Sequence, residues 1–331
     1  MNNHLASNVH IQLEEAAYFI LNHDDFLVVS HIQPDGDAAS STYAMGWMLQ
    51  QLNKTFLMIN ENKMPDKFNY LWGNDQVITL SQHSQQKKYQ CVISLDCGDF
   101  SRIGQVSTLF HENYELLNID HHITNNLFGT HPFVDTQAAA TVQLLYALLH
   151  QLKLAPSLAF NECIYTGLST DTGGFRYANT TPIVMQIAAD LLNMGVQGPD
   201  ITQRVLESYS KTQLLLLQKT LPTLQFAYQD RIAWISVARS ILTLTQATSE
   251  DLEGLVQYPR NVEGVQVGLL FKEIEENQIK VSFRSHHHVD VSKIAQSFGG
   301  GGHQRAAGSV LHGNLEDVVA RVIEITGKEL V

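Results

Sequence analysis

The sequence predicts an α/β protein of two domains, the first built on a doubly wound, mainly parallel sheet. Its 331 residues exceed the usual size of a single hydrophobic core. In the first half, short apolar segments alternate with segments of helical periodicity, as a parallel sheet requires. From about residue 223 the pattern changes to closely spaced strands, which indicates a smaller α+β domain.

The elements of the first half follow from their apolar periodicity. The expected strands cover residues 26–29, 55–59, 91–95 and 115–119, and the expected helices cover residues 9–22, 38–52, 138–152, 156–170 and 181–194. Ligands of a doubly wound sheet bind beyond the carboxyl ends of its strands. The residues that follow each strand are therefore the first candidates for a functional site.

Helical character continues after the first sheet until Pro222 interrupts it. We therefore expect a first domain over residues 1–190, a helical connector over 191–222 and a second domain over 223–331. In the second part of the chain the expected strands cover residues 224–228, 232–237, 265–271 and 279–283, and the expected helices cover residues 200–208, 211–221, 251–258, 291–298 and 315–330.

Composition restricts the location and the partners of the protein. The 44% hydrophobic and 16% charged residues are typical of a folded globular chain. No apolar run approaches the roughly 20 residues that cross a bilayer, and the first ten residues lack the features of a signal peptide. Three scattered cysteines form neither a disulfide framework nor a metal-type pair. We expect a cytoplasmic protein without membrane contacts.

The net charge of −12 argues against a long nucleic acid as partner, because such binding depends on a basic surface. Clustered carboxylates hold divalent cations instead, and the cations attract phosphate. The chain also carries 15 histidines against 21 lysines and arginines, which fits a metal site better than a basic track.

Three metal-binding side chains follow the first expected strand, namely His31, Asp35 and Asp37. Gly36 lets the backbone turn so that both carboxylates point inward. The alternative is that the carboxylates only cap the helix that begins near Ala38. Similar residues at later strand and helix ends favour the metal site, and these are Asp96, Asp120, His121, His122 and Asp171.

Carboxylates and imidazoles without thiolate favour Mn²⁺ or a similar divalent ion over structural zinc. The set is too large for one ion and suits two, an arrangement that commonly hydrolyses phosphoesters. The alternatives are a turn residue at Asp96, a capping role for Asp171 and structural histidines.

A glycine tract, residues 299–302, precedes His303 and Arg305 near the C-terminus. Backbone amides of such a tract approach an anion closely, and we expect a helix to begin at the small residues that follow. A flexible linker is the alternative. The cations of this region, Lys280, Arg284, Lys293 and Arg305, outnumber its one carboxylate, Asp290, which suits a phosphate-bearing ligand.

Taken together, these motifs resemble the DHH/DHHA1 phosphoesterase superfamily, and within it the nano-RNase/pAp phosphatase branch. They occur in the order of the family and span almost the whole chain: HIQPDGDA at 31–38, DCGD at 96–99, DHH at 120–122, TDTGGFRY at 170–177, and GGGGH at 299–303 with AAG at 306–308. The resemblance implies a catalytic DHH domain, a DHHA1 domain and an active site in the cleft between them. It also implies hydrolysis of very short oligoribonucleotides and 3′-phosphoadenosine 5′-phosphate (pAp), usually with manganese.

The resemblance further implies a role for each matching residue. One ion would be held by His31, Asp35 and Asp96, and the other by Asp37, Asp96, His121 and Asp171. Asp120 would orient the neighbouring imidazoles, and His122 would protonate the leaving oxygen. The substrate would be held by Arg284, His303 and Arg305, with Gly300, Gly301 and Gly302 beside them. One departure is His286, where related chains often carry a lysine.

Other functions remain open at this stage. A cyclic or linear dinucleotide phosphodiesterase of the same superfamily is the nearest alternative, and a nucleotide-binding regulator is the non-enzymatic one. The sequence does not rank the substrates, and it leaves the oligomeric state open, a homodimer included.

Overall fold

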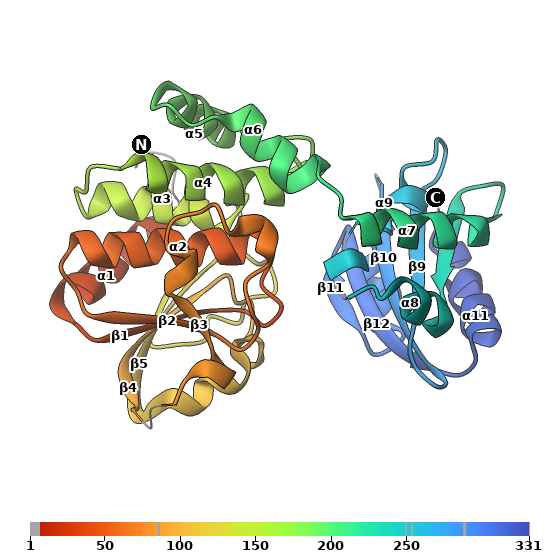
Figure 1. Ribbon diagram of the computed structural model, residues 1–331, viewed down its shortest axis with the longest axis horizontal. Helices are drawn as coiled ribbons and strands as arrows, with labels where there is room; N and C mark the ends of the chain where they lie inside the picture. The colour runs from red at the N-terminus through yellow and green to blue at the C-terminus, as the bar shows by residue number, and fades with distance from the viewer. Residues whose placement is uncertain (1–6, 85–86, 249, 253, 287–288, 331) are drawn as a thin grey trace. The chain divides into compact units, whose positions relative to one another are not determined.

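The computed structural model describes residues 7–84, 87–248, 250–252, 254–286 and 289–330. The chain forms two compact units, Met1–Ser208 and Tyr209–Val331 (Figure 1). The division between them falls inside residues 191–222, the segment for which we expected a helical connector.

Within its described residues, the first unit contains a six-stranded sheet in the order β3-β2-β1-β4-β5-β6, and all neighbouring strands are parallel. The strands are β1 (Phe26–Ser30), β2 (Phe56–Asn60), β3 (Val77–Thr79), β4 (Tyr89–Leu95), β5 (Phe110–Asp120) and β6 (His131–Val134). The predicted doubly wound parallel sheet is confirmed. The strand order reverses between β1 and β4, which is where such sheets place their ligand site.

The two edge strands, β3 and β6, were not predicted. Each is very short, with three residues in β3 and four in β6. Pro132 in β6 lacks a backbone N–H, as is typical of an edge strand. Neither strand is therefore long or regular enough to show a period in the sequence.

Helices and 3₁₀ turns bury the sheet on both faces. The helices are α1 (Ser7–Asn22), α2 (Gly36–Gln51), α3 (Thr141–Gln151), α4 (Leu158–Asp171), α5 (Pro182–Asn193) and α6 (Gly198–Thr202), and the 3₁₀ segments include η2 (Asp66–Phe68), η3 (Asn74–Gln76), η4 (Leu80–Gln82) and η5 (Phe100–Leu109). Figure 1 shows α1 to α4 on one side of the sheet. Phe26 and Val28 of β1 pack into the core on that side, whereas Leu27 and Val29 pack with Ile103 of η5 on the other.

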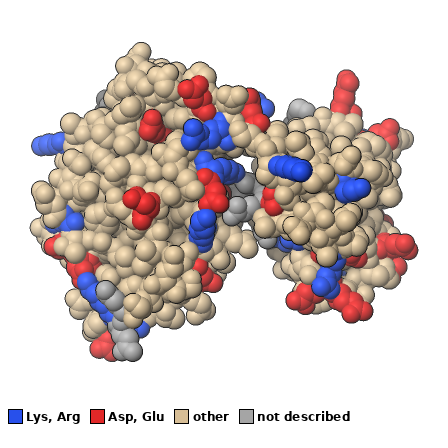
Figure 2. Space-filling model, in the orientation of Figure 1, with Lys and Arg blue, Asp and Glu red and all other residues tan. Residues whose placement is uncertain are grey.

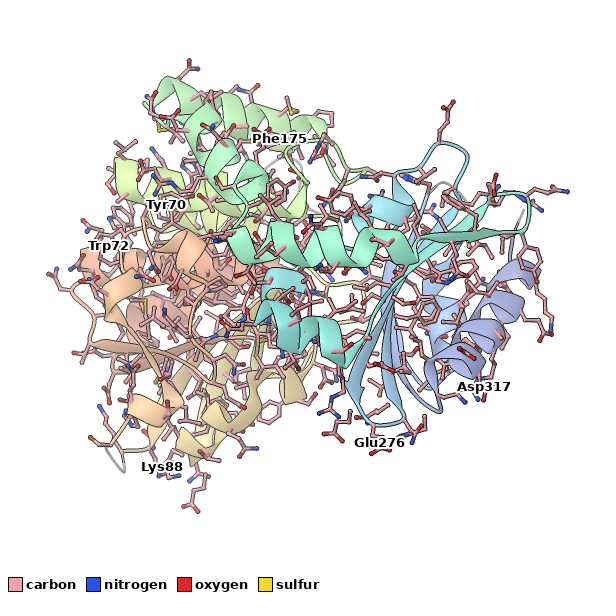
Figure 3. The ribbon with its side chains drawn as sticks, turned by 45° about the vertical axis from the view of Figure 1, so that its right-hand side comes forward. Tyr70, Trp72, Lys88, Phe175, Glu276 and Asp317 are labelled. Carbon is pink, nitrogen blue, oxygen red and sulfur yellow. The ribbon has the colours of Figure 1, made fainter. Side chains whose placement is uncertain are left out.

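Helices α2 and α4 pack closely because two glycines lie at their contact. A Cβ at Gly36 would come within 3 Å of the Thr170 side chain, and one at Gly167 would lie 2.9 Å from Oδ1 of Asp37. Tyr70, labelled in Figure 3, also holds α4, since its hydroxyl lies 2.6 Å from Oγ1 of Thr166. This packing determines where the end of α4, and with it Asp171, lies.

The second unit contains a mixed sheet in the order β11-β12-β10-β9-β8-β7 among its described residues. Its elements are α7 (Lys211–Thr220), η7 (Leu221–Thr223), β7 (Gln225–Ala227), β8 (Ile232–Val237), α8 (Arg239–Thr245), η8 (Glu250–Leu252), α9 (Gln257–Arg260), β9 (Val267–Glu275), β10 (Gln278–Ser285), α10 (Val291–Gln296), β11 (Gly301–His303), β12 (Ala306–His312) and α11 (Leu315–Lys328). Strands β8 and β9 are parallel and the other pairs antiparallel. The predicted α+β domain is confirmed.

Two local predictions in this unit are wrong. Residues 306–312 form β12 rather than the start of a helix, because their side chains alternate toward the core with a period of two. The helix expected over residues 251–258 is divided into η8 and α9. Gly254, with φ of 83°, lies between the two and adopts a conformation that a helix does not allow.

The surface carries charges of both signs, as the composition indicates. On the face shown in Figure 2, basic and acidic side chains are interspersed over both units. No helix in the described part of the chain has the length and apolar character needed to cross a bilayer.

Candidate metal centre

Asp96 directly follows β4 and lies between two imidazoles. The residue is 2% exposed. Its Oδ2 lies 3.5 Å from Nε2 of His31, and its Oδ1 lies 3.6 Å from Nε2 of His121. Its φ of 58° is a strained conformation for a residue with a side chain, costing about 1–3 kcal/mol, and such residues are common at functional sites. The turn after β4 therefore directs one carboxylate toward both histidines.

His31 and Asp35 come from the turn between β1 and α2. Nδ1 of His31 lies 2.8 Å from the carbonyl oxygen of Ile32, so Nδ1 donates to the backbone and Nε2 is the ring nitrogen that faces the site. That Nε2 is 3.8 Å from Oδ1 of Asp35. The same oxygen accepts hydrogen bonds from the amides of Asp37 and Ala38 and thereby caps α2. Asp35 therefore acts as a helix cap and also lies near His31.

A buried asparagine that the sequence analysis missed supports this turn. Oδ1 of Asn60 accepts from the amide of Ser30 at 3.1 Å, and its Nδ2 donates to the carbonyl of His31 at 3.2 Å. Asn60 is fully buried at the end of the apolar strand β2. A polar residue at the end of an otherwise apolar strand was the available signal.

Asp37, His121 and Asp171 form a second group drawn from three elements. Asp37 lies in the first turn of α2, His121 follows β5, and Asp171 is the last residue of α4. Nε2 of His121 lies 3.3 Å from Oδ2 of Asp171 and 3.9 Å from Oδ2 of Asp37. On the other side of the ring, Nδ1 lies 3.3 Å from the carbonyl oxygen of Ala138. The last position of α4 thus brings Asp171 close to His121.

Crowded carboxylates dominate the electrostatics of this group. Burial, followed by repulsion from neighbouring carboxylates, raises the pKa of Asp37 and of Asp171 well above the ordinary value. The pKa of Asp96 shifts in the opposite direction. Burial opposes its ionisation, but the hydrogen bond from His31 and the charges of three histidines outweigh burial and lower its pKa. A cation among these groups would relieve the repulsion.

His122 belongs to a separate chain of hydrogen bonds. Its Nδ1 lies 2.7 Å from Oδ1 of Asp120, which is fully buried. Oδ2 of Asp120 accepts from Nδ2 of Asn125 at 2.6 Å, and this Nδ2 is also 2.9 Å from Oδ1 of Asn118. Burial lowers the pKa of His122, but the bond to Asp120 and the charge of Asp96 outweigh burial and raise the pKa to about 9. Neither asparagine was singled out from the sequence, since amides lack the charge that marked the other residues.

The donor atoms fit a divalent cation. Three overlapping groups of described residues bring their ligand atoms within 4.8 Å of one another: His31, Asp35 and Asp96; Asp37, His121 and Asp171; and Asp96, His121 and His122. All the donors are oxygen or nitrogen, which suits Mn²⁺ and related ions. The thiol of Cys97 is buried next to Asp96 but belongs to none of these groups. The six predicted ligands are thus brought together, with Asp96 common to two of the groups.

The predicted substrate residues of the second unit lie on neighbouring strands. Arg284 of β10 pairs with Gly268 of β9 and with Ala306 of β12. Its Nη1 donates to the carbonyl of Phe283 at 3.0 Å. Arg305 precedes β12 and donates from Nη1 to the carbonyl of Val289 at 2.9 Å, so part of its guanidinium holds the local backbone.

The second half of the glycine tract is part of this sheet. Gly301–His303 forms β11, which pairs with β12. A Cβ at Gly300 would overlap the carbonyl oxygen of Gly308, and one at Gly302 would lie 2.5 Å from the carbonyl of Ala306. Glycine is needed here because two backbones approach closely. The side chain of His303 lies outside the described part of the structure, as do His287 and His288.

Comparisons with known proteins identify the family of both parts of the chain. Two family models match the chain: the DHH family N-terminal domain over residues 25–168, and the DHHA1 domain over residues 238–328. The bifunctional oligoribonuclease and PAP phosphatase NrnA of Thermus thermophilus is 32% identical over 309 residues, which cover 92% of this chain and 89% of that protein. The protein of the same name from Bacillus subtilis is 23% identical over 295 residues, covering 88% and 90%.

A solved structure extends the comparison to the fold. The crystal structure of an exopolyphosphatase-related protein from Bacteroides fragilis matches with a TM-score of 0.89 and 26% identity, and the match covers 99% of this chain and 98% of that one. The family predicted from the motifs is therefore confirmed. This chain belongs to the DHH family, with a DHH N-terminal domain followed by a DHHA1 domain.

Proposed function

We propose that this protein is a metal-dependent phosphohydrolase that cleaves short oligoribonucleotides and pAp. The observation that carries the proposal is the Asp96 carboxylate, whose two oxygens lie 3.5 and 3.6 Å from the imidazoles of His31 and His121. Relatives named bifunctional oligoribonuclease and PAP phosphatase, which align with most of the chain, support the same reaction.

We assign two divalent cations to the site, with Mn²⁺ as the expected metal. The first would be held by His31, Asp35 and Asp96, and the second by Asp37, Asp96, His121 and Asp171. When bound, such cations polarise a phosphoryl oxygen and make water a stronger acid. Residues of the protein would provide the proton transfer and the substrate binding.

His122 is the proposed general acid. The hydrogen bond to Asp120 favours the protonated imidazole, whose pKa in the metal-free protein is about 9, and a protonated His122 can give a proton to the leaving oxygen of the phosphoester. Asp120 holds Nδ1 and thereby orients the ring. Asn125 holds the other oxygen of Asp120 and limits its rotation.

The DHHA1 domain is the proposed nucleotide-binding part. Its candidate contacts are Arg284, Arg305, His303 and the backbone of Gly300, Gly301 and Gly302. An arginine pairs with phosphate through two parallel hydrogen bonds, and exposed glycine N–H groups donate to an anion without hindrance from a side chain. Gly301 and Gly302 are both exposed, whereas the amide of Gly300 donates to the carbonyl of Ala295 at 2.9 Å. The net charge of −12 favours a small substrate over a long nucleic acid.

A substrate panel tests the proposal. Metal-stripped protein receives Mn²⁺ and is offered pAp, a diribonucleotide, a five-residue RNA, a long RNA and a cyclic dinucleotide. We expect turnover of pAp and the two short RNAs, little turnover of the long RNA, and loss of all turnover with a chelator. Preference for the cyclic dinucleotide would favour the phosphodiesterase alternative. Binding without turnover of any substrate would favour a nucleotide-binding regulator.

A further inference from the structure

The first turn of α3 bonds directly to the carboxylates of the metal centre. Ala140 precedes this helix in an extended conformation, and no side chain of the local sequence caps it. Instead, the amides of Thr141 and Val142 donate to the carboxylate of Asp37 at 2.5 and 3.1 Å. Asp37 comes from α2, so a carboxylate from another helix fills the role of the N-cap. The unpaired amides and the dipole at a helix N-terminus both stabilise a negative charge.

Thr141 makes a second contact through its side chain. Its hydroxyl donates to Oδ1 of Asp96 at 2.9 Å, and the residue is fully buried. Thr141 therefore contacts Asp37 with its amide and Asp96 with its hydroxyl. These two carboxylates belong to different groups of candidate ligands. Thr141 itself is in none of the three groups and carries no charge, which is why the motifs did not reveal it.

The direction of these bonds determines how the carboxylates face the site. A carboxylate on a single side-chain bond rotates unless both of its oxygens are held. Both oxygens of Asp37 accept amide hydrogens from α3. Oδ1 of Asp96 accepts from Thr141, while its Oδ2 faces His31. The first turn of α3 therefore limits the rotation of both carboxylates, and Thr141 is the residue of this turn that contacts each of them.

We infer that Thr141 is a positioning residue, whose hydroxyl orients Asp96 relative to Asp37 before a divalent cation binds. This inference rests on the proposed metal-dependent function and assigns Thr141 no direct contact with the cation. A partner that orients a metal ligand typically contributes about 10- to 100-fold to metal affinity. The hydroxyl, rather than the bulk of the side chain, is expected to make that contribution.

The test compares variants that keep or remove the hydroxyl. Thr141→Val replaces the hydroxyl by a methyl group of similar size, Thr141→Ala removes it without adding bulk, and Thr141→Ser keeps it. Thr42→Val is the matched control, because Thr42 is equally buried in α2 and its hydroxyl bonds only to the carbonyl of Ala38 among the described residues. Circular dichroism in the presence of a chelator shows whether each variant folds. If one of the two hydroxyl-free variants does not fold, the Mn²⁺ affinity of the other still tests the role of the hydroxyl.

Mn²⁺ affinity is measured by calorimetry on metal-stripped protein, and the bound ion is observed by electron paramagnetic resonance. We expect Thr141→Val and Thr141→Ala to weaken binding about 10- to 100-fold and to change the spectrum. Thr141→Ser and Thr42→Val should retain the affinity and the spectrum of the unmodified protein.

Each alternative result has a distinct meaning. Unchanged affinity in the hydroxyl-free variants would overturn the role of Thr141 while leaving the metal centre in place. Equal loss in Thr141→Ser would overturn it as well, because packing would then be the cause. Absence of Mn²⁺ binding by the unmodified protein would overturn the proposed function itself, and the inference with it.

Discussion

Nδ1 of His122 lies 2.7 Å from Oδ1 of Asp120, and the other oxygen of this buried carboxylate accepts from Asn125. Asp120 thus orients the imidazole of His122 through Nδ1, and Asn125 in turn limits the movement of the Asp120 carboxylate. An acid catalyst benefits from this arrangement, because its proton must point at one oxygen of the substrate.

Replacement of Asn125 by leucine should therefore slow the reaction without weakening either binding step. We expect kcat for a diribonucleotide to fall about tenfold, since a misdirected acid loses part of its contribution. KM and the affinity for Mn²⁺ should stay unchanged. Steady-state kinetics and calorimetry measure these quantities, and Asn126→Leu is the control because Asn126 is exposed and bonds only weakly, at 3.4 Å, to Asp99. A rise in KM with unchanged kcat would contradict the role of Asn125.

Loss of Asp96 should be the most damaging single change. Asp96→Ala removes the carboxylate that lies between His31 and His121, and we expect activity to fall about a thousandfold or more with loss of tight Mn²⁺ binding. Asp99→Ala removes the same charge from the same DCGD motif, where Asp99 caps the Ser101 amide and bonds weakly to Asn126, and should remain active. Near-normal turnover by Asp96→Ala in a discontinuous nucleotide assay would refute the two-metal assignment.

Arg284 should contribute to the affinity for the substrate and not to the affinity for the metal. We expect Arg284→Ala to raise KM for pAp about 10- to 100-fold, because a charged hydrogen bond to phosphate is lost. Its affinity for Mn²⁺ should not change. Lys280→Ala removes an exposed cation from the same strand, β10, and controls for net charge. An equal loss of substrate and metal affinity in Arg284→Ala would count against separate substrate and metal sites.

Metal-free protein should become less stable as pH rises from about 6.5 to 10. Burial lowers the pKa of His31, but bonds to Asp35 and Asp96 outweigh burial and raise it to about 10, and the pKa of His122 is raised to about 9. Both exceed the unfolded value near 6.5. The folded state therefore holds these protons more tightly, so their stabilisation is complete below pH 6.5 and is lost through pH 9 to 10. Thermal unfolding in a chelator should show Tm falling across this window.

Added Mn²⁺ should oppose that trend, because the cation binds neutral imidazole and competes with the protons. The rise in Tm caused by Mn²⁺ should be greater at pH 8.5 than at pH 6.5. The His122→Gln variant should show a shallower decline in the chelator. A chelator-treated protein whose Tm increases from pH 6.5 to 9 would contradict the stated direction of both histidine pKa shifts.

The sequence by itself determined the fold class, the family and the six candidate metal ligands. Strand ends of a parallel sheet meet at one edge, so His31, Asp96 and His121, which directly follow β1, β4 and β5, were bound to lie near one another. The order of the motifs along the chain indicated the family. The helix-capping interpretation of Asp35 followed from its position before a helix, and its contacts with the amides of Asp37 and Ala38 confirm it.

Only the tertiary structure revealed the residues that hold these ligands. Asn60, Asn125 and Thr141 are neutral, and each acts through a contact with a segment distant in sequence or through a buried hydrogen bond. No local pattern distinguishes such a residue from an ordinary polar one. The strand formed by residues 306–312 was missed for a related reason, since small residues after a glycine tract suit either a helix or a closely packed hairpin. The choice depended on pairing with β10, which is a contact between segments and not a property of either one.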